Sequence, residues 1–574
     1  MGCGWELAIL VAGAFLIRYS LFAFRGDYLD WDETLYLLLA RNLLAGDGLS
    51  LNGLPHIALS PGVPIFTGFV AKLSGMSLLA ANRLLSAAAG AALVVPAWYL
   101  FRIAAGQHVA RLAALLLVGW TALIDVGPRF GPMWAHFYAG SEPLYLTALF
   151  GAFALGELSL RRGGIIRFAS LAGAGAVLAV AYLARPEAVV IGGLYAVFRG
   201  RELLRDGRVK EMLVGVGIAL ATFLVVVAPH LFHLRQLTGT WMLSGNLGPT
   251  ASTADLYQEL VRDDSKIPPY LQAWWALDRD HERMVNPYWG VGPTAPWRQR
   301  LEDYQAALGA VWTSQPTGVE SLLDRAGAYL LALWTLGLPL FLPFALVGLW
   351  PEGSPGRRFP PFVLAAFVGS LLISWQVYAL PRFFLVLVPP LALWAGLGVV
   401  RVARWSWVQP LREPERVMVF VLLATGLGLA AVRGLSDAAI AARERGRSDR
   451  RAAERLSEAI ETETALMSWH PRLAYWGGWD WRVLPVASLD AVVHYAAHRD
   501  VDGMFLARGS YSPLQLEADY VVILMAPELA AAYRELEVDA GPHRHPPARL
   551  VPIGTVAEFP TGLMMLRAPD PEDE

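Results

Sequence analysis

The sequence predicts a polytopic α-helical membrane protein with a C-terminal soluble α/β domain. Of the 574 residues, 55% are hydrophobic and 17% are charged, and the mean hydropathy is +0.42. A soluble protein would carry about a quarter charged residues. Apolar runs of the length that a transmembrane helix needs, about 20 residues, recur up to residue 434. Beyond residue 434 the chain mixes helical runs with short apolar strands.

The transmembrane module, residues 1–434, holds about eleven expected spans. The first apolar run lacks the basic n-region and cleavage site of a signal peptide, so we interpret it as a retained span. The span at 187–198 is short, with about twelve residues. The expected spans are 5–24, 78–101, 108–125, 141–160, 168–184, 187–198, 212–232, 327–350, 360–379, 382–400 and 417–434.

Basic residues between the spans predict the orientation of the module. They gather in four loops, which share one side if the spans alternate, and the positive-inside rule makes that side cytoplasmic. An odd number of spans then puts the tail, 435–574, outside the cytoplasm with the outer loops 25–77 and 233–326. The basic residues are Arg161, Arg162, Arg167, Arg199, Arg201, Arg205, Arg208, Lys210, Arg357, Arg358, Arg401, Arg404, Arg412 and Arg416.

The net charge and the cysteine content limit the possible partners and cross-links of the chain. A formal net charge of −2 argues against a nucleic-acid partner. A single cysteine, Cys3, excludes internal disulfide bonds. The membrane and its lipids are therefore the expected surroundings.

The first outer loop and the tail have their own predicted elements. Apolar spacing predicts a helix from Glu33 to Ala45, stopped by Gly46, and a second helix over Val63–Gly75. Both are too short to span, and two amphipathic helices lying in the interface plane fit them. In the tail, Leu489–Ala497 is typical of a helix and Tyr520–Met525 of a strand.

Three acids, Asp30, Asp32 and Glu33, stand at the start of the first of these helices. Acids in a first turn favour the helix dipole and satisfy free N–H groups, so helix capping is one interpretation. One cap does not need three acids in four residues, which favours a site. A carboxylate there can act as a general base toward a hydroxyl or bind a divalent cation.

Two further motifs combine charge with proline. Glu142, before Pro143, opens the fourth span on the predicted outer side, where it either caps the helix or joins a site with the first acids. Arg185 and Glu187 flank Pro186 between two spans, which favours a tight interhelical turn with a local charge pair.

Outward-facing basic residues are candidates for binding a phosphate. Arg382 lies between the ninth and tenth spans, and a planar guanidinium can bind two phosphate oxygens at once. Arg83 and Arg129 are further candidates. His56 and His136 lie in outer loops, where histidines are commonly structural, and no cluster of metal ligands surrounds them in the sequence.

In their order along the chain, these motifs resemble those of glycosyltransferases that have the GT-C fold and use lipid-linked sugars. The resemblance is to the protein O-mannosyltransferase and aminoarabinose lipid A transferase superfamily, and it covers roughly residues 25–400. In place of a lysine common in aminoarabinose-type relatives, this chain has SPG at 60–62. The contact of this loop with the donor phosphate, and the identity of the donor, are therefore not determined by the resemblance. The matching segments are DETLYLLLARNLL at 32–44, SPGVPIF at 60–66, AANRL at 80–84, SEPLY at 141–145, RPE at 185–187 and PRFFLVLVP at 381–389.

The resemblance implies transfer of a sugar, with inversion, from a polyprenyl-phosphate donor to a glycan, lipid or protein acceptor on the extracytoplasmic face. Asp32 or Glu33 would take the proton of the acceptor hydroxyl, and Glu142 would orient the acceptor or tune that base. Arg382, aided by Arg83 or Arg129, would hold the phosphate, and the wider substrate-binding set adds Asp30, His56, Arg185 and Glu187. We expect no metal, with a divalent cation at the acidic cluster as the alternative. The expected location is the bacterial cytoplasmic membrane.

Two other functions are compatible with a many-pass membrane protein. A transporter or flippase should place charges near the bilayer midplane, often in two related halves. Here the charges gather at one outer rim and the halves do not match, which favours the enzyme. A non-catalytic membrane subunit, with the tail as a partner-binding module, is the third alternative.

Overall fold

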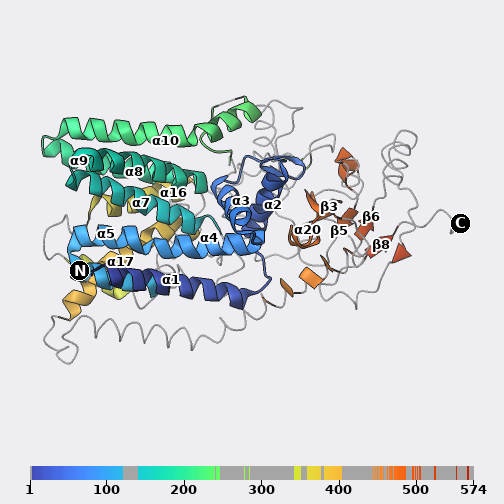
Figure 1. The fold of residues 1–574 in the computed structure, drawn as a ribbon, viewed down its shortest axis with the longest axis horizontal. Coiled ribbons are helices and arrows are strands. Elements are labelled where there is room, and N and C mark those ends of the chain that lie inside the picture. Colours follow the sequence, from blue (N-terminus) through green and yellow to red (C-terminus); the bar gives the residue numbers. More distant parts are fainter. Residues whose placement is uncertain are drawn as a thin grey trace, which may run out of the picture. The chain divides into compact units, whose positions relative to one another are not determined.

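A computed structural model describes most of the helical part of the chain and pieces of the tail (Figure 1). The described residues are 3–119, 140–239, 241–245, 342–350, 359–376, 381–403 and 471–485, with shorter pieces of 277–284, 443–505 and 522–567. The chain divides into two compact units. The helical unit comprises Met1–Arg25, Ser60–His233 and Pro316–Ala441, and the loop–tail unit comprises Gly26–Leu59, Leu234–Gln315 and Ala442–Glu574.

The helical unit is built from apolar helices. Among the described residues, five segments are long and apolar enough to cross a membrane: Leu78–Ala105, Glu142–Arg161, Gly164–Ala184, Val209–Thr238 and Phe384–Val402. The helices are α1 (Cys3–Arg25), α3 (Gly62–Ser74), α4 (Leu78–Ala92), α5 (Val94–Ala105), α6 (Gln107–Gly119), α7 (Glu142–Arg161), α8 (Gly164–Ala184), α9 (Ala188–Arg205), α10 (Val209–Thr238), α16 (Pro361–Gln376) and α17 (Val388–Val402), with the 3₁₀ helix η4 (Pro381–Leu387) before α17.

These helices confirm the polytopic membrane fold, and most expected spans coincide with one of them. The short span at 187–198 is α9, which continues to Arg205 and so has 18 residues. The expected span 327–350 is described only from residue 342, and 417–434 lies outside the described residues. The total of eleven spans therefore stays a prediction.

Small residues allow the helices of this unit to approach closely. A Cβ added at Gly175 in α8 would lie 2.1 Å from the carbonyl oxygen of Ala219 in α10. A Cβ at Gly396 in α17 would lie 3.1 Å from that of Ala113 in α6. Membrane helices gain packing in this way because lipid supplies no hydrophobic force between them. These two glycines thus allow close helix interfaces.

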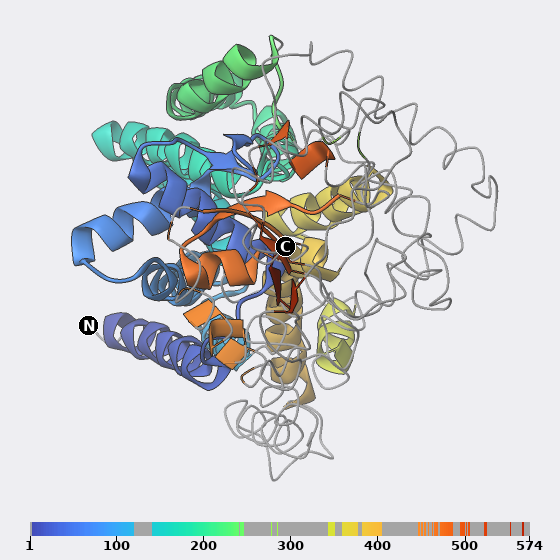
Figure 2. The same cartoon turned by 90° about the vertical axis from the view of Figure 1, so that its right-hand side faces the viewer.

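The loop–tail unit combines the first outer loop with a mixed sheet. The loop forms α2 (Trp31–Ala45) and a hairpin of β1 (Ser50–Leu51) and β2 (Leu54–Pro55). The sheet has the strand order β4-β3-β5-β6-β8-β7, and the helix α20 (Arg472–Gly477) lies between β3 and β4 in the chain. Figure 2 shows the described strands of the tail in orange to red. The strands are β3 (Ala465–Ser468), β4 (Asp480–Val483), β5 (Gly503–Phe505), β6 (Val522–Leu524), β7 (Val551–Pro552) and β8 (Met565–Arg567).

The sheet confirms the α/β character predicted for the tail. Strand β3 pairs in parallel with both β4 and β5, whereas β5 and β6 are antiparallel. The expected strand at 520–525 contains β6. The expected helix at 489–497 is described as helical at 494–496. Both helices expected in the first outer loop are also confirmed, as α2 and α3.

Candidate functional site

Helix α2 begins with a capping box made by two of its three acids. Asp30 is the N-cap residue, and its backbone N–H donates to Oε2 of Glu33 at 3.4 Å. Both side chains are buried, at 8% and 2% exposure. The capping interpretation is thus confirmed for Asp30 and Glu33. Asp32 lies half-buried in the same turn and is the acid that the capping box does not use.

Residues of the tail hold α2 near both of its ends. Nη2 of Arg41 donates to the carbonyl oxygen of Trp479 at 2.8 Å. At the start of the helix, the ring of Trp31 meets that of Trp481 edge to face, with 6.2 Å between centroids. Edge-to-face rings and a charge-assisted hydrogen bond both have directional geometry. The tail therefore fixes the orientation of the turn that carries Asp32.

The hairpin that follows α2 inserts Asn52 against the sheet of the tail. Asn52 has a left-handed backbone, with φ 57°, and is buried at 1% exposure. Its Oδ1 accepts from the backbone N–H of Val483 at 3.0 Å, and its Nδ2 donates to Oη of Tyr495 at 3.2 Å. Burial raises the pKa of Tyr495, so its hydroxyl stays neutral. Arg499 donates to the carbonyl oxygen of Asn52.

His56 lies in the interior of the loop–tail unit. It is 2% exposed, and burial lowers its pKa to about 3. Its Nε2 accepts the backbone N–H of Leu59 at 2.8 Å, which requires the neutral ring. His56 therefore carries no positive charge at neutral pH and stabilises the loop.

In the helical unit, Arg185 brings two sequence motifs together. Its Nη1 lies 2.7 Å from Oε1 of Glu142, and its Nη2 lies 3.0 Å from Oε1 of Glu187. Arg185 is the C-cap residue that follows α8 and Glu142 opens α7, and both are buried, at 9% and 3% exposure. The predicted turn with a local charge pair is thus present. The pairing with Glu142 was not predicted, because no local pattern links residues from different helices.

A close backbone contact accompanies this cluster. A Cβ added at Gly62, the first residue of α3, would lie 2.7 Å from the carbonyl carbon and oxygen of Leu183. Leu183 lies two residues before Arg185 in the chain. Only glycine allows the start of α3 to pack so closely on the end of α8. This gives a structural role to the segment at 60–62.

The other predicted site residues are placed separately. The guanidinium carbon of Arg83 in α4 lies 5.7 Å from the ring centroid of Phe22. Arg382 lies in η4, but its side chain is outside the described part of the structure, as is all of Arg129. Asp32 and Glu142 belong to different compact units, so their convergence on one site stays a prediction.

Whether the acidic cluster binds no metal or a divalent cation also stays a prediction. Among the described residues, no group of three His, Cys, Asp or Glu side chains can hold a metal ion. The two buried acids of α2 are used by the capping box, and Glu142 is used by Arg185. Asp30, Glu33 and Glu142 thus each have a structural partner in this fold.

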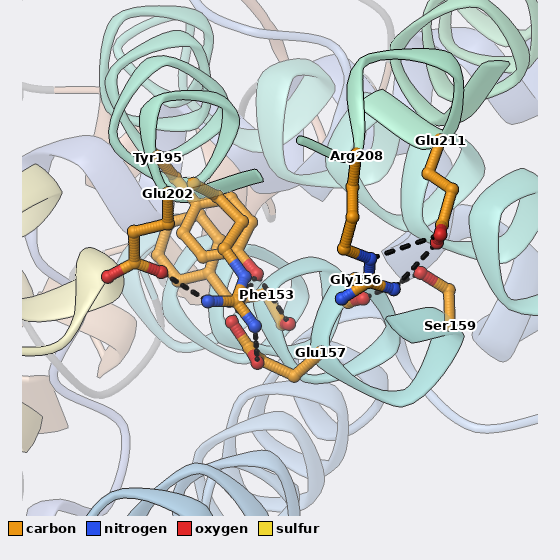
Figure 3. A network of polar contacts seen from close by, with 9 residues as sticks. Phe153, Gly156, Glu157, Ser159, Tyr195, Glu202, Arg208 and Glu211 are labelled. Carbon is orange, nitrogen blue, oxygen red and sulfur yellow. Dashed lines mark hydrogen bonds and ion pairs between the residues drawn. The ribbon is translucent and has the colours of Figure 1, made fainter. Parts of the chain in front are cut away.

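One further polar cluster in the helical unit is not among the motifs predicted from the sequence. Glu157, in α7, accepts from Oη of Tyr195 at 3.1 Å and lies 3.0 Å from Nη2 of Arg199 (Figure 3). Arg199 also pairs with Glu202. An acid within an apolar run was the available signal, because such a charge needs a partner from another helix.

No protein-family model and no curated protein matches the chain. Solved structures do match its fold. ArnT from Cupriavidus metallidurans in the apo state has a TM-score of 0.51 at 15% identity, over 86% of this chain and 87% of that one. The same enzyme bound to undecaprenyl phosphate has a TM-score of 0.50 at 16% identity, over 86% and 88%.

An archaeal enzyme has the same fold. The Archaeoglobus fulgidus oligosaccharyltransferase in complex with Zn and sulfate has a TM-score of 0.51 at 13% identity, over 86% of this chain and 67% of that one. A structure of that enzyme, AglB, with an inhibitory peptide and a dolichol-phosphate has a TM-score of 0.50 at 12% identity, over 88% and 69%. The chain therefore has the GT-C fold, shared by ArnT and by archaeal oligosaccharyltransferase.

Proposed function

We propose that the protein is a glycosyltransferase that moves a sugar from a polyprenyl-phosphate donor to an acceptor hydroxyl on the extracytoplasmic face of the membrane. Two structures of this fold contain a polyprenyl phosphate: undecaprenyl phosphate in ArnT and dolichol-phosphate in AglB. Shared fold alone does not fix function, so the site must carry the proposal.

The observation that carries the proposal is that only two of the three acids at the start of α2 form the capping box. Asp30 and Glu33 form the capping box, whereas Asp32, half-buried beside them, takes no part in it. A carboxylate at this position can accept the proton of an acceptor hydroxyl. The acidic motif therefore contains both a structural pair and a candidate base.

In the proposed reaction, Asp32 takes the proton while the acceptor oxygen attacks the anomeric carbon of the sugar. The bond from that carbon to the phosphate oxygen breaks, and the polyprenyl phosphate leaves with the bonding electrons. One displacement inverts the anomeric configuration. Arg382, with Arg83 or Arg129, stabilises the charge on the departing phosphate, which is already a good leaving group.

Glu142 has a positioning role in this proposal. Arg185 holds its carboxylate at 2.7 Å, and Arg185 is itself held by Glu187. A buried carboxylate with a fixed partner can orient an acceptor through its other oxygen. Arg185 and Glu187 therefore act through Glu142 and not as bases themselves.

The test compares Asp32→Asn with Asp47→Asn, an exposed acid just beyond the other end of α2. Donors are polyprenyl-phosphate hexose and pentose radiolabelled in the sugar, with total membrane extract as acceptor. We expect Asp32→Asn to lower transfer by about 10²–10⁴-fold, while Asp47→Asn transfers normally and both variants keep the wild-type melting temperature. Equal transfer by Asp32→Asn and wild type would remove Asp32 from the mechanism.

The same donors separate the enzyme from a transporter. Full-length protein in sealed vesicles, with labelled donor on one side and no acceptor, should leave the label where it was added. Movement of intact donor across the bilayer, with no transfer in the extract assay, would instead establish the flippase alternative.

A further inference from the structure

The helical unit contains a half-open apolar cavity between α7, α8, α9 and α10. Its volume is about 330 Å³, and its lining is mostly aliphatic and aromatic. Two lining residues of α10, Val216 and Leu220, are also exposed, at 47% and 52%. The cavity therefore opens on an outward apolar face of a helix that is long enough to span the membrane.

One end of this cavity is charged. Arg167, Arg199 and Glu211 are among its lining residues. Glu211 pairs with Arg167 at 3.0 Å and with Arg208 at 2.6 Å, so one carboxylate serves two guanidinium groups (Figure 3 shows Glu211 and Arg208). The stretches 157–167 and 199–211 contain eight arginines and lysines but four acids. These two stretches of the chain, which contain the charged lining residues, therefore carry a net positive charge.

Two donors at this end have no acceptor among the residues that the structure describes. The Nε–H groups of Arg167 and Arg199 are buried and find no hydrogen-bond partner among the described residues. A buried donor without an acceptor costs free energy that an oxygen-rich anion would recover. The cavity thus combines an apolar chamber with unsatisfied cationic donors at one end.

We propose that this cavity binds an acyl chain of an anionic phospholipid, with the lipid phosphate at Arg167. An apolar chamber of this kind does not hold water well, and one that opens to the bilayer can admit a chain. The basic loops around Arg167 are predicted to be cytoplasmic, so the lipid would come from that leaflet.

The cavity is distinct from the proposed sugar-transfer site. Helix α7 begins at Glu142 and ends at Arg161, and the cavity is lined by its residues from Ala152 onward. At about 1.5 Å per residue, the two ends of this helix are roughly 30 Å apart. The lipid would therefore bind the protein while a donor occupies the other end of the module.

The experiment uses full-length protein in detergent and native mass spectrometry. Phosphatidylglycerol or phosphatidylcholine with identical acyl chains is titrated into the delipidated protein. We expect phosphatidylglycerol to bind about tenfold more tightly, because only its head group carries a net negative charge to pair with the free donors. Equal binding of the two lipids would overturn the proposal.

Two glycines offer a matched pair of variants. Gly193 lines the cavity, and a Cβ added there meets nothing within 4 Å. Gly217 in α10 has the same open surroundings but is not among the lining residues. Gly193→Trp should fill the cavity and abolish phosphatidylglycerol binding, whereas Gly217→Trp should bind as wild type does. Undiminished binding by Gly193→Trp would contradict the assignment.

A charge variant and a second lipid complete the test. Arg167→Gln leaves Glu211 paired with Arg208, and it should remove the preference for phosphatidylglycerol over phosphatidylcholine.

Polyprenyl phosphate binding should be the same in wild type and Gly193→Trp, because the carrier binds elsewhere. Loss of polyprenyl phosphate binding in Gly193→Trp would instead make the cavity a carrier site and overturn the phospholipid assignment.

Discussion

Arg185 at the end of α8 holds Glu142 at the start of α7 through a buried ion pair of 2.7 Å. A second carboxylate, Glu187, lies 3.0 Å from the same guanidinium. Two motifs that are far apart in the chain therefore form one polar cluster at one end of the helical unit. The pair is nearly inaccessible to water, so its two charges depend on each other.

Removing Arg185 alone should destabilise the protein more than removing Arg185 and Glu142 together. Arg185→Met leaves Glu142 as a buried charge without its cation, which costs on the order of 3–5 kcal/mol. The double variant Glu142→Gln with Arg185→Met removes this deeply buried charge and leaves only Glu187, whose side chain is more exposed, so it should melt closer to wild type. Thermal unfolding of the detergent-solubilised proteins measures this. A double variant no more stable than Arg185→Met would show that the pairing contributes nothing.

The acids of the capping box should affect stability and leave sugar transfer in place. Asp30→Ala removes an N-cap, which costs about 1 kcal/mol, and lowers the melting temperature. Glu33→Gln keeps an acceptor for the Asp30 N–H and should change stability less. Both variants should transfer sugar at rates within a few-fold of wild type, measured below their melting temperatures. A loss as large as that of Asp32→Asn would move the catalytic role to Glu33 or Asp30.

Asn52 should tie the first outer loop to the tail through its side chain. Asn52→Gly keeps the left-handed backbone but leaves the N–H of Val483 without its acceptor, a cost of about 1–3 kcal/mol. Asn52→Ala adds about 1–2 kcal/mol of backbone strain. Asn52→Asp keeps the acceptor oxygen and should be the mildest of the three. Limited proteolysis of the tail in each variant checks this order, and a tail equally resistant in Asn52→Gly and wild type contradicts it.

His56 should make the loop–tail unit less stable in mild acid. Its pKa is about 3 in the folded protein and near 6.5 when exposed, so between these values the unfolded chain binds more protons. Stability is therefore complete above pH 6.5 and falls as the pH drops toward 3, by at most about tenfold in the folding equilibrium per pH unit. Thermal unfolding between pH 7.5 and 5 measures the slope.

The control for His56 is a second histidine. His56→Gln removes the titrating group and should flatten the pH dependence over this range. His108→Gln removes an exposed histidine at the start of α6 and should leave the dependence as it is in wild type. A wild-type slope in His56→Gln would assign the acid sensitivity to another group.

Local patterns predicted the helices well because hydropathy and helix signals act over a few residues. The apolar runs predicted α7, α8 and α10, and Gly46 predicted the end of α2, where it adopts a left-handed backbone. The short run at 187–198 was underestimated because charged residues from Arg199 to Arg205 continue the helix. Hydropathy does not register such a polar extension.

The sequence by itself determined a many-pass helical membrane module, an acidic motif at the start of α2 and a strand-containing tail, because each depends on neighbouring residues. Tertiary structure decided the partners: Arg185 for Glu142, the sheet of the tail for Asn52, and Arg199 for Glu157. Buried polar groups need partners wherever the fold supplies them, and those partners come from distant parts of the chain. The capping box of Asp30 and Glu33, which does not include Asp32, likewise became visible only in the structure.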